Sequence, residues 1–152
     1  MKRTPGPECA SVVLVRVRFG ETDLMGIVHH AAYLSWFEVG RVEYLRRRGI
    51  DALDWAARGV HLPVIEASLR YRRSARFDER LTVETRLAEL GRASVGFEYR
   101  VLRPSPAGDE LLTEGATLLA CVNDRHVPTR LPADVANALL GAETRPRAAS
   151  EV

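Results

Sequence analysis

The residues best suited to chemistry lie within 18–50, just before and inside a predicted helix. Two carboxylates, Glu21 and Asp23, stand in a short loop, and His29 and His30 follow shortly after. A carboxylate can act as a nucleophile or as a general base. The free N–H groups at the start of a helix favour negative charge that develops during a reaction. The stretch therefore predicts an acid that attacks or activates on one side and a helix end that stabilises an anion on the other.

Hydrophobic periodicity predicts the elements that position this loop. A strand is expected first, with alternating valines, and a long helix follows the loop and ends at Gly49. Asp51 is the predicted N-cap of a second, short helix. The expected strands are 12–19, 61–73, 79–90, 93–103 and 110–122, with a last short strand near 126–130, and the expected helices are 30–48, 51–58 and 132–140.

This order, one long helix followed by a run of strands, predicts an α+β fold. The segments fit the hotdog fold, in which an antiparallel sheet wraps around one long central helix. Such a sheet has a free edge, which proteins commonly cover or pair, so dimerisation through that edge is expected. The predicted division is a flexible N-terminus over 1–10, a hotdog domain over 11–141 and a flexible tail over 142–152.

Composition excludes several classes of function. A net charge of +2 over 152 residues is too small to suggest nucleic acid by itself, and no apolar run approaches the length of a membrane span. The start of the chain lacks the apolar region of a signal peptide, and the two cysteines have no metal-ligand spacing. The four histidines form no metal pattern. We therefore expect a cytoplasmic protein with no metal and no cofactor.

The stretch RFGETDLMGIVHHAAYLSWFEVGRVEYLRRRGI resembles the signature of the 4-hydroxybenzoyl-CoA thioesterase family, including the acyl-CoA thioesterases of the Tol-Pal operon type. The resemblance continues through LRYRRSARFDERLTVETRLAEL and EGATLLACVNDRHVPTRLPADV and covers roughly residues 12–140. It implies hydrolysis of an acyl-CoA or acyl carrier protein thioester to a free acid and a thiol. It also implies that Asp23 is the catalytic nucleophile or general base, and that the backbone N–H of His30 faces the thioester oxygen.

The resemblance further suggests a set of residues around the substrate. The turn at Gly26 shapes the approach, Tyr33 and Phe37 line an acyl pocket with the segment 62–64, and Arg92 contacts coenzyme A phosphates. The full substrate-binding set is Gly26, Val28, Tyr33, Phe37, Glu66 and Arg92, with Glu66 as a reserve acid. The family often has an asparagine where this chain has Ala32, which puts the hydrogen bonding of Asp23 in question.

Two points remain open from the residues alone. Glu21 is as easily an ion-paired loop residue as a chemical group, and Arg41, inside the apolar stripe of the long helix, needs a partner such as Glu38 or Glu66. The alternatives to a thioesterase are a non-catalytic acyl-CoA-binding hotdog module and a hotdog hydratase or dehydratase. The expected assembly is a homodimer or a dimer of dimers, that is, a homotetramer, and the acyl group is open.

Overall fold

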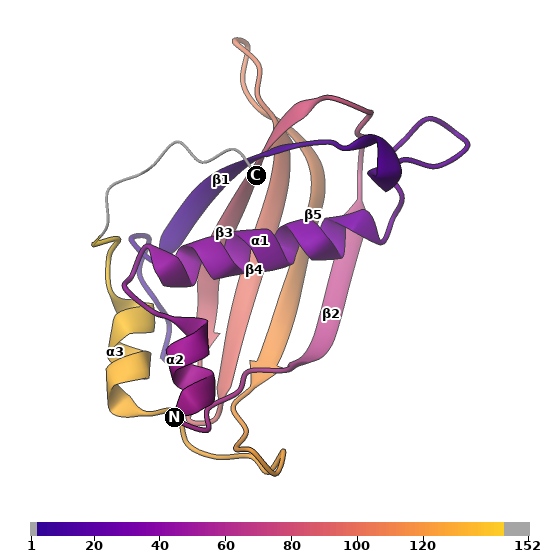
Figure 1. Ribbon diagram of the computed structural model, residues 1–152. Helices are drawn as coiled ribbons and strands as arrows, with labels where there is room; N and C mark the ends of the chain where they lie inside the picture. The colour runs from indigo at the N-terminus through magenta and orange to yellow at the C-terminus, as the bar shows by residue number, and fades with distance from the viewer. Residues whose placement is uncertain (1–2, 145–152) are drawn as a thin grey trace.

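One long helix lies across a five-stranded antiparallel sheet, as Figure 1 shows for the computed structural model, which describes residues 3–144. The strands lie in the order β1-β3-β4-β5-β2. In chain order the elements are β1 (Ala10–Arg16), the 3-10 helix η1 (Phe19–Glu21), α1 (Ala32–Arg46), α2 (Ala52–Ala57), β2 (Val64–Tyr71), β3 (Arg80–Leu90), β4 (Ser94–Arg103), β5 (Glu110–Ala120) and α3 (Ala133–Leu140). The predicted α+β hotdog arrangement is confirmed.

The predicted strand near 126–130 is wrong. This segment makes an isolated bridge between Val122 and Pro128 and otherwise forms a turn. The side chain of Asn123 closes the turn, because its Oδ1 accepts the backbone N–H groups of Arg125 (2.9 Å) and Val127 (3.1 Å). Side-chain bonding of this kind competes with strand pairing.

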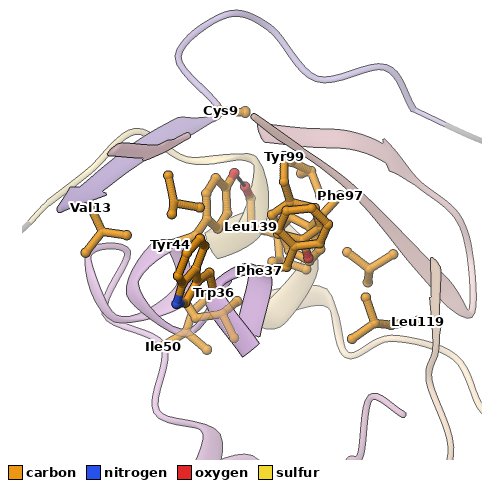
Figure 2. Close-up of a cluster of buried hydrophobic side chains, with 14 of the residues drawn as sticks. Cys9, Val13, Trp36, Phe37, Tyr44, Ile50, Phe97, Tyr99, Leu119 and Leu139 are labelled. Carbon is orange, nitrogen blue, oxygen red and sulfur yellow. Dashed lines mark hydrogen bonds between the residues drawn. The ribbon is translucent and has the colours of Figure 1, made fainter. Parts of the chain in front are cut away.

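Helix α1 sits close to the sheet because glycines leave room for it. A Cβ at Gly40 of α1 would collide with the hydroxyl of Thr85 on β3, and a Cβ at Gly115 of β5 would lie 2.6 Å from Cε2 of Phe37. Phe37 in turn stacks on Tyr99 with ring centroids 4.3 Å apart, at the centre of the buried cluster in Figure 2. Gly40 therefore lets the helix backbone approach β3, and Gly115 leaves space on β5 for the ring of Phe37.

The side of α1 that faces away from the sheet is uncovered. The stripe formed by Leu34, Glu38 and Val42 is exposed to solvent. No helix within residues 3–144 is long and apolar enough to cross a membrane.

The C-terminal end of α1 binds both ends of the described chain. Arg48 is buried and donates to the Ser11 hydroxyl (2.8 Å) and to the carbonyl of Gly141 (2.8 Å), while Arg47 contacts Glu143 at 3.4 Å. The terminal segments also contact the fold, since Arg3 bridges to Leu90 and Thr144 donates to the carbonyl of Arg47, and residues 1–2 and 145–152 lie outside the described residues.

The strands of the sheet run between two ends of the molecule. Strand β3 starts beside the loop that carries Asp23, since Val17 donates to the carbonyl of Glu79 (2.9 Å), and it ends at the β3–β4 turn that contains Arg92. Its 11 residues place these ends about 33 Å apart at about 3.3 Å per residue. We call them the loop end and the turn end.

Candidate active site

The loop around Asp23 is a tight turn that leaves one carboxylate oxygen unbonded. The N–H of Asp23 donates to the carbonyl of Ile27 (2.9 Å), and the N–H of Gly26 donates to the carbonyl of Asp23 (3.0 Å). Gly26 has a φ of +76°, a conformation that glycine adopts without strain. Oδ1 of Asp23 accepts the N–H of Met25 at 2.8 Å, whereas Oδ2 accepts no hydrogen bond from residues 3–144. The turn therefore orients the carboxylate and leaves Oδ2 free to react.

Several backbone donors at the start of α1 have no acceptor among residues 3–144, as is usual at a helix N-terminus. His29 accepts the N–H groups of the two residues after His30: its Nδ1 accepts that of Ala31 (3.1 Å), and its carbonyl accepts that of Ala32 (3.0 Å). Ala31, the N-cap, makes no side-chain cap. The N–H of His30 has no acceptor in the described part of the chain. His29 thus holds the turn before α1, and the N–H of His30 is one of the donors left unpaired.

Asp23 and His30 both line one small pocket of 230 Å³ at the loop end. Val28 and Tyr33 form its buried side, with exposed fractions of 4% and 2%. Burial raises the pKa of Tyr33, so its phenol stays neutral at ordinary pH. The remaining lining residues are Met25, Ile27, Tyr71, Arg72, Arg73 and Ser74. A carboxylate, a free amide and an apolar wall therefore meet in a single depression.

Glu21, the other acid of the loop, is bonded on both oxygens. Its Oε2 accepts the indole N–H of Trp36 at 2.7 Å, and its Oε1 accepts the backbone N–H of Arg18 at 2.8 Å. Trp36 is buried in α1. Glu21 therefore ties the loop to the helix, and the structural interpretation of this residue fits its contacts.

The sequence matches the family model described as the thioesterase-like superfamily over residues 17–139. The chain belongs to this superfamily. The putative acyl-CoA thioesterase YneP of Bacillus subtilis is 33% identical over 109 residues, covering 72% of this chain and 77% of that protein. The acyl-CoA thioester hydrolase YbgC of Escherichia coli is 30% identical over 122 residues, covering 80% and 89%. A putative esterase of Synechocystis is 32% identical over 108 residues, and the match spans 64% of its length.

Solved structures agree with this assignment. A hypothetical protein of Thermus thermophilus is 43% identical with a TM-score of 0.78, covering 85% of this chain and 96% of the other. A DHNA-CoA thioesterase of Staphylococcus aureus is 30% identical with a TM-score of 0.74, covering 80% of each chain. A 4-hydroxybenzoyl-CoA thioesterase at 22% identity and TM-score 0.78, covering 86% of this chain and 98% of the other, shares the fold.

Within this thioesterase-like chain, three predicted contacts lie elsewhere. Phe37 is fully buried against Gly115 and Tyr99 and lines no part of the pocket. Glu66 is exposed on the outer face of the sheet, because its neighbour Ala67 pairs with the buried Thr117 on the inner face. Arg41 donates to the Tyr99 hydroxyl at 3.1 Å and not to Glu38 or Glu66.

Arg92 lies at the turn end, on the opposite end of the sheet from Asp23. Its carbonyl accepts the N–H of Leu131 at 2.9 Å, which brings Arg130 next to it. No ion pair of either guanidinium with residues 3–144 is present. The sequence did not single out Arg130, because only the fold brings the segment before Leu131 to the β3–β4 turn.

Tyr71 is a second residue that the sequence did not single out. It ends β2, lines the pocket, and its hydroxyl donates to the carbonyl of His30 at 2.8 Å. A tyrosine at the end of a strand carries no local signal for a contact 41 residues away along the chain.

Proposed function

We propose that this chain hydrolyses acyl-CoA thioesters to a free acid and a thiol, with Asp23 as general base or nucleophile and the His30 N–H polarising the carbonyl. One observation carries the proposal: Asp23, whose Oδ2 accepts no hydrogen bond from residues 3–144, and His30, whose N–H has no acceptor there, line the same pocket. Membership of the thioesterase-like superfamily and the relatives named as acyl-CoA thioesterases support the same chemistry.

The reaction follows from the chemistry of a thioester. As a general base, Asp23 takes a proton from water while the water oxygen bonds to the carbonyl carbon. As a nucleophile, Oδ2 bonds to that carbon itself, and water then hydrolyses the resulting anhydride. In both routes the carbonyl oxygen gains negative charge, which the N–H of His30 and the positive end of α1 stabilise, and the carbon–sulfur bond breaks to release the thiolate. In single-turnover hydrolysis in ¹⁸O-water, label in the Asp23 carboxylate identifies the nucleophilic route with water attack at the Asp23 carbonyl carbon, because the general-base route leaves the oxygens of Asp23 unexchanged.

The substrate contacts divide between the two ends of the sheet. Val28 and Tyr33 supply the apolar wall for the acyl group, and Gly26 gives the turn that holds Asp23 at its mouth. The unpaired guanidiniums of Arg92 and Arg130 suit the phosphates of coenzyme A, or of the phosphopantetheine arm of an acyl carrier protein.

The free edge of β2 supports a homodimer. Strand β2 pairs with β5 along one edge only, and its Val64 and Ile65 are 45% and 56% exposed. An unpaired edge with exposed apolar side chains favours pairing with a second copy. If two β2 strands pair antiparallel across a twofold axis, the partner's turn end approaches the loop end that carries Asp23. The proposed assembly is a dimer of dimers, that is, a homotetramer. The proposed location is the cytoplasm, a reducing compartment in which the buried free thiols of Cys9 and Cys121 persist.

The deciding experiment replaces Asp23 by asparagine, which keeps the size but removes the charge and the basicity. We expect kcat on any cleaved acyl-CoA to fall by about 10²–10⁴-fold, with little change in KM or melting temperature. Asp54→Asn is the matched control, because it removes an exposed acid of α2 that does not line the pocket and should keep full activity.

A folded Asp23→Asn variant with wild-type kcat contradicts the assignment of the acid. A folded wild type that binds acyl-CoA but cleaves no member of a thioester panel favours the non-catalytic module instead.

A further inference from the structure

Tyr71 connects the edge strand of the sheet to the start of α1. Its hydroxyl donates to the carbonyl of His30 at 2.8 Å, and its ring meets that of Tyr33 edge-on with centroids 5.4 Å apart. Tyr71 is 49% exposed, while Tyr33 beneath it is buried. The contact therefore sits at the mouth of the pocket and not in the core.

Tyr71 holds the carbonyl of His30, and the N–H of that same residue has no acceptor among residues 3–144. The turn before α1 has no side-chain N-cap at Ala31, and its other bonds come from His29 and from the loop, where the His29 N–H donates to the carbonyl of Glu21 at 2.7 Å. Tyr71 adds an anchor from the sheet. Holding the His30 carbonyl limits rotation of that residue about its backbone dihedrals, and so fixes the direction of its N–H.

We propose that Tyr71 is a positioning residue, which aims the His30 N–H at the thioester oxygen from the end of β2. The inference rests on the proposed function. Donors stabilise a developing oxyanion effectively when their direction is fixed before the reaction, so a donor that can swing away loses rate and not substrate affinity. Tyr71 itself does not exchange a proton in this scheme.

The test is Tyr71→Phe, which removes one oxygen and keeps the ring against Tyr33. We expect kcat to fall about fivefold to tenfold, the range that one ordinary hydrogen bond supplies, with KM, melting temperature and oligomeric state unchanged. The pH profile of kcat should keep its shape, because no proton donor is lost. The ¹³C shift of the His30 carbonyl should move, which reports the contact without reference to activity.

Tyr44→Phe is the matched control at the other end of the same helix. The Tyr44 hydroxyl donates to the carbonyl of Leu139 at 2.7 Å, a bond of the same kind but fully buried and far from the pocket. This variant should lower the melting temperature and keep wild-type kcat.

The outcomes separate the two proposals. If wild type cleaves thioesters and Asp23→Asn does not, wild-type kcat in Tyr71→Phe overturns the positioning role alone. A fall in kcat that Tyr44→Phe shows equally also overturns it, because general loosening of α1 then explains both. A change in the shape of the pH profile overturns it in favour of proton transfer by Tyr71. If wild type cleaves nothing, both proposals fail.

Discussion

If the active site is built from two copies of the chain, a heterodimer of two different impaired variants should have more thioesterase activity than either homodimer. Asp23 and Arg92 lie at opposite ends of the sheet, about 33 Å apart along β3. The pantetheine arm that joins the phosphates of coenzyme A to the thioester is shorter than this distance. One substrate can therefore meet both residues only if Arg92 comes from the partner subunit. A heterodimer of Asp23→Asn and Arg92→Ala chains should then hold one intact site and one doubly altered site.

The expected magnitude follows from the contact that Arg92 would make. A charge-assisted hydrogen bond to phosphate contributes about 1.5–3 kcal/mol, so Arg92→Ala should raise KM for acyl-CoA by roughly 10- to 100-fold. Its kcat/KM then falls to between about 1% and 10% of wild type. The heterodimer should show about half of the wild-type kcat/KM, since one of two symmetric sites is intact.

The assay needs heterodimers free of either parent. Co-expression with two different affinity tags and tandem purification supplies them, and thiol release at substrate concentrations well below KM measures kcat/KM. A heterodimer at half the value of the Arg92→Ala homodimer would refute the shared site, because each protomer would then carry its own complete set. Wild-type KM in the Arg92→Ala homodimer would remove Arg92 from substrate binding altogether.

Three further predictions concern single residues. His30→Ala keeps the backbone N–H and should retain most of kcat; a loss as deep as that of Asp23→Asn would show that the imidazole does chemistry. The KM effect of Arg92→Ala should shrink as salt screens the contact, measured between low and high ionic strength. Burial alone would raise the pKa of Glu43, but hydrogen bonds from Arg46 and Arg47 outweigh it and leave the pKa below its ordinary value. The ionised Glu43 therefore stabilises the fold above its unfolded-state pKa, and this stabilisation is lost as pH falls through its folded-state pKa. Glu43→Gln should lower the free energy of unfolding by about 3 kcal/mol near neutral pH. The loss measured in denaturant unfolding curves at acid pH should be much smaller.

Local pattern was enough to predict the helices and the five strands of the sheet, but not the turn at 123–127. Alternation across β3 places Leu81, Val83 and Leu87 on the buried side, and the structure has them there. The sequence also showed the glycine that ends the turn after α1, Gly49 with a φ of +72°, and the cap of α2 by Asp51, which accepts the N–H of Leu53. Each of these depends on neighbours a few residues away.

Contacts between elements were harder to predict. The face of Glu66 follows from an irregular register between Val64 and Glu66, and a bulge reverses every alternation argument beyond it. Phe37 belongs to the apolar stripe of α1, but only the position of Gly115 on β5 decides that it fills the core and not a pocket. Arg48 follows two other arginines at a helix end, a pattern typical of a solvated face, yet it is 5% exposed because carbonyls from both chain ends surround it.

The candidate site combines these two levels. Its acid and its helix start were predictable because Asp23 and His30 are seven positions apart, in a signature that local sequence carries. What holds them comes from distant segments: Trp36 bonds the loop through Glu21, and Tyr71 bonds the helix start from the sheet. Although the neighbouring groups are hydrogen-bonded, Oδ2 of Asp23 and the N–H of His30 have no protein partner among residues 3–144. Asp23 and His30 line the same pocket, so an acid and a backbone donor without a protein partner are available there to a ligand. The carbonyl group of a thioester suits both groups at once: its carbon is the electrophile for Asp23 or for water that Asp23 activates, and its oxygen accepts a hydrogen bond from the N–H of His30.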